Sequence, residues 1–364
     1  MESFRRGQST ALAKYLTSVD RHTTICPISD PDELTYDTEG CTNRGGYRFT
    51  AISFRQVAQI IAPGLSTLLP DLSGTIARKQ VDEEMIDEHQ ARDIFNKLVR
   101  LRFPLLSSYR LLRNENTKTI DGVVGQKHRS LENLTMLEAA GSAVATLTDD
   151  IEFYAAAVVG RKMMLWYRAK SPMFVREVSG KPWSFYHGYY FRNAESTGTS
   201  VRGGLTVYTR HGSCLAPFTK KSRVTHIGRD FNQRLGKMFQ HILGPDAPVE
   251  KFQEGVDNLL STSLGYAELG DKEKKRFEKD AVKALSNIGL PQRWASEIFE
   301  TTLKVGSVDL ADLKPLVDFN HIYATRTFFD MFSPLVRMAR DLPSNRREGV
   351  EQVAYKVLTG KLEM

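Results

Sequence analysis

The sequence predicts an α+β protein in which a central, mostly antiparallel sheet with helical cover is followed by an all-helical C-terminal region. Three observations predict this fold: apolar residues recur at helical spacing up to about residue 104, strand patterns broken by Gly, Asn and Ser follow, and helical spacing returns after Arg223. A chain of 364 residues has room for two or three subdomains. We therefore expect a mainly helical N-terminal domain with loops (1–104), a β-rich central domain (105–222) and a helical C-terminal region (223–364).

The N-terminal third combines a polar stretch with two helical patterns. Turn-forming residues predict one helix within residues 1–50, followed by loops and short strands. Phe54 and Ile61 then share a face of a helix expected over 53–61. A longer helix is expected over 82–102, because its acidic residues gather at the N-terminus, where the helix dipole favours them.

Strand patterns dominate the middle of the chain. The expected strands cover 109–112, 120–124, 151–159, 162–168, 185–192 and 205–210. One helix, expected over 131–140, interrupts this series. Because strands and helices do not alternate, an antiparallel sheet fits the pattern better than a parallel one.

The last third reads as helical throughout. The expected helices cover 231–243, 249–264, 272–288, 292–305, 322–339 and 347–358. In the second of these, Val249, Phe252 and Val256 lie on one apolar stripe that would face a core. The mixed charges of residues 272–279 are typical of a solvated helix face rather than of a basic patch.

Composition restricts the compartment and the kind of site. No apolar run approaches the roughly 20 residues of a membrane helix, and the first residues lack the apolar stretch of a secretory signal. The three cysteines, Cys26, Cys41 and Cys214, do not form a disulfide framework or a zinc-binding pattern. We therefore expect a cytoplasmic protein without membrane contact and without a structural metal.

The positive charge of the chain is concentrated in residues 160–237. This segment holds 15 Lys and Arg against three acids, a balance of +12, whereas the flanking residues carry −5. It also holds 12 Phe, Trp and Tyr residues. Cations neutralise phosphates and aromatic rings stack on unpaired bases, so the combination predicts binding of DNA or RNA that is single-stranded at least in part.

The candidate contact residues follow from this segment. Arg223, His226 and Arg229 are spaced three apart, so one helical face would present all three to a phosphate backbone; a solvated linker explains the spacing equally well. Core packing is the alternative for each aromatic residue. The candidate nucleic-acid contacts are Arg168, Lys170, Arg192, Arg202, Arg210, Lys220, Lys221, Arg223, His226, Arg229, Arg234 and Lys237, and the candidate stacking residues are Trp183, Tyr186, Tyr189 and Tyr208.

Gly198, Gly203 and Gly204 surround a loop of small residues. Its backbone amides could approach a phosphate oxygen closely, and an ordinary hairpin turn explains the loop equally well. The loop lacks the Lys-Ser/Thr of a P-loop and the following helix of a Rossmann motif. A nucleoside triphosphate or dinucleotide site is therefore not expected there.

Three stretches in this part of the chain, 123–133, 191–198 with Cys214, and 226–229, resemble a family of phage/plasmid-like proteins of unknown function. The resemblance covers about residues 105–240. This chain differs in having His128 where Tyr is common and Leu215-Ala216 where Asn-Gly tends to follow the cysteine. The resemblance implies a mobile-element origin, a bacterial host cytoplasm, and a role near replication, recombination or host takeover.

An enzyme is the first alternative. Asp149, Asp150 and Glu152 form an acidic cluster beside the basic segment, as a metal-dependent nuclease requires, although a turn before a strand also explains them. No cofactor is expected except Mg²⁺ or Mn²⁺ under this alternative. Cys214 is expected to be a small buried residue rather than a nucleophile, and Glu195 to pair with an arginine.

We therefore expect a non-enzymatic, largely sequence-independent nucleic-acid-binding protein that acts in replication, recombination or strand annealing. A phage assembly or host-inhibition module is the second alternative, because aromatic residues and Arg are also enriched where proteins bind each other. Its partner would be a host protein. The chain could also form a homo-oligomer.

Overall fold

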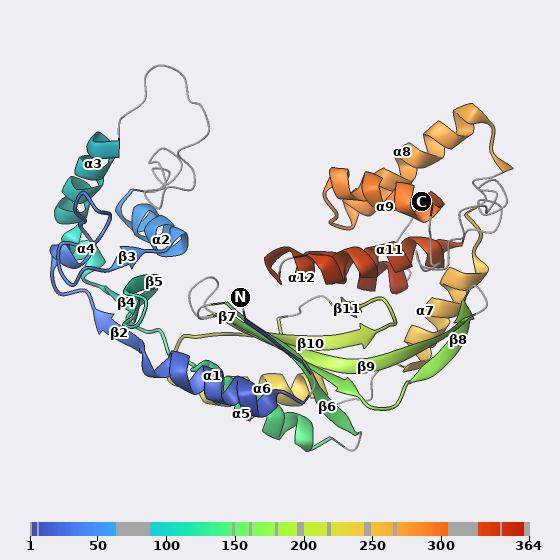
Figure 1. Cartoon of the computed structure of the whole chain (residues 1–364), viewed down its shortest axis with the longest axis horizontal. Helices are drawn as coiled ribbons and strands as arrows, with labels where there is room; N and C mark the ends of the chain where they lie inside the picture. The colour runs from blue at the N-terminus through green and yellow to red at the C-terminus, as the bar shows by residue number, and fades with distance from the viewer. Residues whose placement is uncertain are drawn as a thin grey trace.

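The protein is built from two sheets and a C-terminal group of helices (Figure 1). The computed structural model describes residues 2–5, 7–62, 88–147, 150–159, 162–178, 181–194, 200–216, 220–243, 249–264, 268–304, 327–342 and 344–359. An eight-stranded antiparallel sheet lies at the centre, a four-stranded mixed sheet belongs to the N-terminal part, and helices follow the last strand. The predicted α+β class is confirmed.

The eight-stranded sheet has the order β1-β6-β7-β9-β10-β11, with β8 paired to β9 and β12 paired to β10. Its strands are β1 (Glu2–Arg5), β6 (Ile151–Val159), β7 (Lys162–Ala169), β8 (Phe174–Val178), β9 (Lys181–Ala194), β10 (Ser200–Tyr208), β11 (Ser213–Leu215) and β12 (Arg223–Thr225). Every pairing in this sheet is antiparallel. The chain therefore returns from its first residues to the sheet formed by its middle.

Alternation along the strands gives this sheet two different faces. The apolar face carries Met163, Leu165, Phe191 and Val201, which pack against α1 (Ser9–Arg21), α5 (Asn133–Ala145) and α6 (Phe231–Leu243). Figure 1 shows these three helices side by side beneath the strands. The polar face carries the alternate residues, among them Lys162, Trp166, Arg168, Arg192 and Arg202, and it is the face on which the candidate site lies.

The N-terminal unit has its own sheet and core. The sheet has the order β2-β4-β5-β3, with β3 and β5 parallel. Phe54, Phe95 and Leu111 are among the buried residues that join the sheet to its helices. The elements are β2 (Thr23–Pro27), β3 (Arg48–Phe49), β4 (Tyr109–Asn114), β5 (Thr119–Gly125), a 3₁₀ turn (Pro31–Glu33), α2 (Ala51–Ile61), α3 (Glu88–Leu101) and α4 (Phe103–Leu106).

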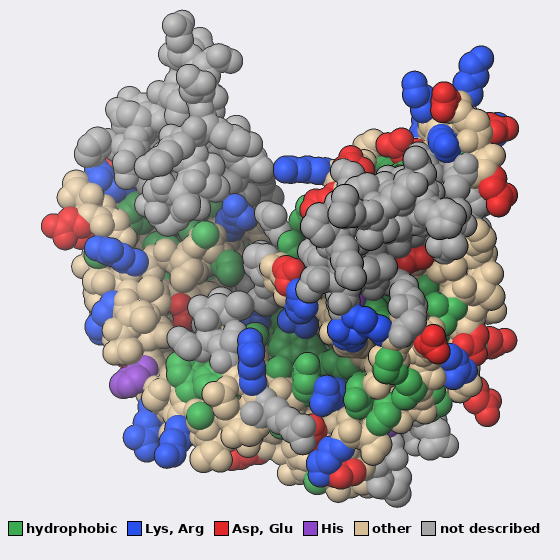
Figure 2. All heavy atoms as spheres, turned by 45° about the vertical axis from the view of Figure 1, so that its right-hand side comes forward, with side chains coloured by type: hydrophobic (Ala, Val, Ile, Leu, Met, Phe, Trp, Pro, Cys, Tyr) green, Lys and Arg blue, Asp and Glu red, His purple; other side chains and the backbone are tan. Residues whose placement is uncertain are grey.

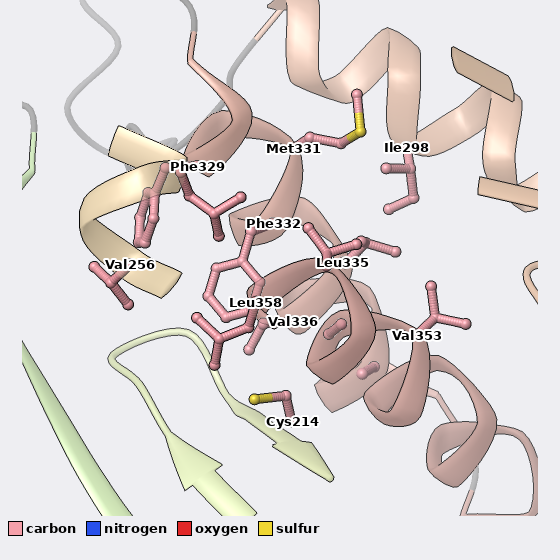
Figure 3. Close-up of a cluster of buried hydrophobic side chains, with 14 of the residues drawn as sticks. Cys214, Val256, Ile298, Phe329, Met331, Phe332, Leu335, Val336, Val353 and Leu358 are labelled. Atoms are coloured by element: carbon pink, nitrogen blue, oxygen red, sulfur yellow. The ribbon is translucent and has the colours of Figure 1, made fainter. Parts of the chain in front are cut away.

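The C-terminal helices share one core with part of the large sheet. They are α7 (Val249–Ser261), α8 (Asp271–Asn287), α9 (Gln292–Lys304), α11 (Phe328–Asp341) and α12 (Ser344–Leu358). Figure 3 shows Phe332 and Val336 of α11 close to Cys214 of β11, with Leu358 of α12 beside them. The edge strand β11 is therefore covered by the two helices that come last in the chain.

The elements that share a hydrophobic core differ from the three domains expected from the sequence. Strands β4 and β5, which the sequence analysis placed in the central domain, belong to the N-terminal sheet. Helix α6, which it placed in the C-terminal region, packs on the large sheet with α1 and α5. The expected helical segments 82–87 and 322–326 lie outside the described residues, and the remaining expected helices and strands are present with ends shifted by a few residues.

The close packing around Gly255 in α7 predicts that a larger residue there would destabilise the protein. A methyl group at this position would meet the carbonyl oxygen of Leu358 at 2.2 Å, so Gly255→Ala must push α7 away from the end of α12. We expect a loss of about 1–3 kcal/mol in the free energy of unfolding. Gly236→Ala in α6 has nothing within 4 Å and should instead stabilise the protein by up to about 1 kcal/mol, because alanine favours the helix. Urea unfolding of both variants measures the difference, and an equal effect of the two would contradict this account.

Candidate functional site

Four cations from four strands lie at one end of the polar face. Arg192 of β9 is directly paired with Arg202 of β10, and Arg202 is directly paired with Arg223 of β12. Lys162, the first residue of β7, completes the group, because β7 pairs with the same end of β9. Neighbouring strands are about 4.8 Å apart, so the three arginines form a line about 10 Å long. We call Lys162, Arg192, Arg202 and Arg223 the cation row.

The cations of the cation row lie close enough to affect one another's pKa values. Burial, followed by the charges of Arg192 and Arg223, lowers the pKa of Arg202. Burial, followed by the charge of Arg192, lowers the pKa of Lys162. Like charges on directly opposed strand positions are destabilising. A bound polyanion would remove this repulsion.

Helix α12 supplies the carboxylates next to the cation row. Glu348 forms an ion pair with Arg192, and its charge raises the pKa of Lys162 and Arg202 against the larger lowering effects. Among these five described side chains, four cations thus face one carboxylate. One helical turn further on, Glu351 accepts hydrogen bonds from Ser213 Oγ at 2.6 Å and from Arg347 Nε at 2.9 Å. The first half of α12 therefore lies on the polar face.

A hollow is visible in the space-filling view. Figure 2 shows hydrophobic side chains in the floor of a depression and Lys and Arg side chains around it. Cationic edges around a recessed floor favour an anionic ligand that enters the hollow rather than one that rests on a flat surface.

The remaining candidate contacts in the strands are held by neighbouring groups. The guanidinium of Arg168 lies between the rings of Tyr154 and Tyr186, 4.6 Å and 4.7 Å from their centroids. Arg168 also pairs with Glu152 at 3.7 Å, and Lys170 pairs with Asp150 at 2.5 Å. Arg210 lies in the turn between β10 and β11, away from the cation row.

The predicted helical face of Arg223, His226 and Arg229 is wrong. Arg223 begins a strand, and His226 is fully buried, with Nδ1 2.9 Å from the carbonyl oxygen of Arg129 and Nε2 3.0 Å from Oδ1 of Asn193. Arg229 is exposed in the loop that follows. His226 is therefore a structural residue, and the three side chains do not share a surface.

His226 belongs to a buried network that joins the stretches on which the family resemblance was based. Asn193 Nδ2 donates to the carbonyl of Leu131 at 2.8 Å and to Oδ1 of Asn133 at 3.1 Å. The rings of His128 and His226 lie 5.3 Å apart. The network connects β9, the loop before α5 and the segment after β12, so these residues fix the fold beside the cation row rather than contact a ligand.

The basic residues after position 219 are dispersed. Lys220 and Lys221 are exposed in the turn before β12. Lys237 is exposed on α6, which covers the apolar face of the sheet. Arg234 of the same helix donates to the carbonyl oxygen of Ile227 and pairs with Asp230 at 3.2 Å. Of the expected contact surface from Lys220 to Lys237, only Arg223 belongs to the cation row.

Most of the candidate stacking residues are core residues. Trp183, Tyr189 and Tyr208 are only 2%, 3% and 3% exposed. Tyr186 is half-buried, and Arg168 occupies one face of its ring. The expectation of an exposed stacking platform is wrong for these residues. Trp183 packs in the core that contains α11, Tyr189 packs in the core that contains α5 and α6, and Tyr208 packs among residues of neighbouring strands.

The acidic alternative receives no geometric support from the part of the chain that the structure describes. Asp150 and Glu152 each pair with a cation, and the described residues contain no group of three His, Cys, Asp or Glu that could hold a metal. Asp149 and Glu195 lie outside the described residues. Cys214 is fully buried, which raises the pKa of its thiol and makes it a small core residue, as expected.

The small-residue loop is described only in part. Residues 195–199, with Gly198, lie outside the described residues. Gly203 lies in β10, where a methyl group would meet side-chain atoms of Ile242 and Phe191 at 2.7 Å. Close packing of α6 on the sheet therefore explains Gly203 without a ligand.

Two members of the site were missed by the sequence analysis. Lys162 begins an expected strand, and its even spacing from Trp166 and Arg168 is a signal that would have placed it on the polar face. Glu348 lies in a helix more than 150 positions away from Arg192, and no local pattern connects the two.

Comparisons with protein-family models, with curated proteins and with solved structures found no match. Within the described ranges, no helix combines the length and the apolar character needed to span a bilayer. We therefore infer the function from the geometry of the polar face.

The raised pKa of Glu351 predicts how the stability of the protein depends on pH. Burial raises the pKa of Glu351 above its ordinary value of 4.5, against the opposing effects of Arg347 and Ser213. The folded protein thus binds this proton more tightly than the unfolded chain, so its contribution is complete below pH 4.5 and is lost as the pH rises through the folded-state pKa. Glu351→Gln cannot lose this proton, and its stability relative to the wild type should increase by up to about 1.4 kcal/mol per pH unit across that window.

Urea unfolding between pH 4 and pH 8 measures this difference. The exposed Glu278→Gln in α8 is the matched control for removal of a carboxylate. The account is wrong if the difference in free energy of unfolding between Glu351→Gln and the wild type is constant over this pH range. It is also wrong if Glu351→Gln becomes less stable relative to the wild type as the pH rises, because burial would then not determine the pKa of Glu351.

Proposed function

We propose that the protein binds single-stranded nucleic acid on the polar face of its large sheet, with the phosphate backbone on the cation row. The setting that fits this activity is replication, recombination or strand annealing of a phage or plasmid in a bacterial cytoplasm. The observation that carries the proposal is the direct pairing of Arg192, Arg202 and Arg223 on three adjacent strands, with Lys162 beside them.

A polyanion fits this arrangement better than a single carboxylate partner. Glu348 already pairs with Arg192, and the cations remain close enough to lower the pKa values of Lys162 and Arg202. Arginine presents a planar fork of donors that matches phosphate oxygens. A line of such forks suits the regularly spaced charges of a nucleic-acid backbone.

The partly buried positions of these cations favour a single strand over a duplex. Lys162 and Arg202 are only partly exposed, so the ligand must bend toward them. Duplex DNA is stiff, with a persistence length of about 50 nm, whereas a single strand bends freely. Phosphate contacts carry no base information, so binding should be largely independent of sequence.

Removing two cations from the row should weaken binding without unfolding the protein. In Arg202→Gln/Arg223→Gln, each lost contact should reduce the affinity for a single strand of arbitrary sequence by at least about tenfold, because charge-assisted hydrogen bonds contribute roughly 1.5–3 kcal/mol. The slope of log K against log salt should become shallower by about 1.4, since each phosphate contact on a single strand contributes about 0.7. Fluorescence anisotropy with labelled DNA and RNA at several salt concentrations measures both quantities.

Lys275→Glu on the exposed face of α8 is the control for a change of net charge. It should leave the affinity within about twofold of the wild type, while the melting temperature of Arg202→Gln/Arg223→Gln should be unchanged or higher, because repulsion is relieved. Equal losses in both variants would reduce the effect to overall charge. Tighter binding of duplex than of single strands would overturn the strand preference.

A further inference from the structure

A second feature of the polar face is a cavity of about 530 Å³ beyond the first turn of α12. It lies between strands β1, β6 and β7, the turn that joins β10 to β11, and the connection from α11 to α12. Sites for small organic ligands usually measure about 300–1,000 Å³. The cavity is therefore large enough for a ligand of nucleotide size and much larger than one phosphate ion requires.

Four arginines from distant parts of the sequence line this cavity. They are Arg5 of β1, Arg210 of the β10–β11 turn, Arg340 of α11 and Arg347 of α12. Arg340 pairs with the adjacent Asp341 at 2.9 Å. The cavity is thus lined by arginines from four elements, and a guanidinium group provides paired donors for the oxygens of a phosphate group.

Arg347 is held in place by three neighbouring groups, of which Ser213 and Trp166 also line the cavity. It donates from Nε to buried Glu351 at 2.9 Å and from a terminal nitrogen to Ser213 Oγ at 3.3 Å. Its guanidinium lies over the indole of Trp166, 5.2 Å from the ring centroid. A guanidinium held on three sides is oriented before a ligand arrives, which reduces the entropic cost of binding.

One wall of the cavity is aromatic. Trp166 lines the cavity and is only 4% exposed, and its indole Nε1 finds no hydrogen-bond partner among the described residues. A buried donor without a partner is rare and costs free energy. Tyr154 lines the same wall and packs edge-to-face against Tyr208, with ring centroids 4.8 Å apart. The wall therefore combines ring surfaces with an unused donor.

The start of α12 adds to the positive potential. Leu342 and Arg347, which line the cavity, lie on either side of Ser344, where α12 begins. The N-terminus of a helix carries about half a positive charge and attracts phosphate groups. This contribution supports the arginines and does not by itself define the site.

We propose that this cavity binds a nucleoside phosphate, with the phosphate among Arg210, Arg340 and Arg347 and the base beside Tyr154 on the aromatic wall. The ligand is either a free nucleotide or the 5′-phosphorylated terminal nucleotide of a strand, because both present the same chemistry. The site is separate from the cation row, so it goes beyond the proposed function and does not depend on it. The aromatic wall distinguishes a nucleotide from inorganic phosphate or a sugar phosphate.

Isothermal titration of the full chain with AMP, adenosine and inorganic phosphate tests the assignment. AMP should bind at least tenfold more tightly than either adenosine or phosphate, because only AMP contacts both the arginines and the aromatic wall. Arg210→Ala and Arg340→Ala should each weaken AMP binding at least tenfold, whereas Arg276→Ala, an arginine 86% exposed on α8, should change it less than twofold. Trp166→Phe keeps an aromatic ring and removes the Nε1 donor. It should weaken AMP binding less than the two arginine variants do.

Two oligonucleotides separate the possible sources of the ligand. A gain in affinity from a 5′-phosphate over a 5′-hydroxyl, lost in Arg210→Ala, identifies a strand end; tight AMP binding without this gain identifies a free nucleotide. The variant Arg202→Gln/Arg223→Gln should lose single-strand binding and keep AMP binding, which distinguishes failure of one site from failure of the other. The proposal is wrong if AMP binds no better than inorganic phosphate, or if folded Arg210→Ala and Arg340→Ala variants bind AMP like the wild type.

Discussion

Glu351 has no exposed surface, and its carboxylate accepts from Ser213 of the edge strand and from Arg347 of its own helix. A carboxylate leaves water only when hydrogen bonds and opposite charge compensate for the lost hydration. The Ser213 contact joins α12 to strand β11, whereas the Arg347 contact lies within α12 itself. The position of α12 places Glu348 next to the cation row and Arg347 beside the cavity, so both proposed sites depend on how this helix packs on the sheet.

The polar face keeps charge where stability alone would remove it. Arg192, Arg202 and Arg223 occupy directly paired positions, and a polar or apolar residue at any of them would relieve repulsion. The indole nitrogen of Trp166 is buried without a partner in the described structure. Departures from local stability often mark functional positions, because a ligand supplies the missing interaction.

The sequence predicts the elements of this fold better than it predicts the site. Strand periodicity located β6, β7, β9 and β10, and the apolar stripes located the C-terminal helices, because both depend on neighbours in the chain. The short strands β8, β11 and β12 were missed, since three to five residues carry too little pattern. The helical face expected around position 226 is wrong, and the binding role expected from the charge of residues 160–237 stays a prediction.

The reason for that difference is the way the layers assemble. Trp183 and Tyr189 were candidates for an exposed surface, but α11 and α6 belong to the layers that bury them, and no local pattern shows which helix covers which strand. His226 was grouped with Arg223 by spacing, yet β12 ends between them. Arg5, Arg340 and Arg347 come from the two ends of the chain, so only tertiary structure brings them to one cavity.

This assembly from both ends has a consequence for how the protein matures during synthesis. Strand β1 can pair only after β6, about 150 residues later, has been made. The cavity is complete only after α12 has been made, more than 300 residues after Arg5. Contacts so distant in sequence form late, because closing a long loop costs entropy before any contact compensates for it. Arg192, Arg202 and Arg223 are made in the second half of translation and before α12, so a nascent chain displays them until α12 has been made and has docked. Occupancy of the cavity would report that α12 has docked.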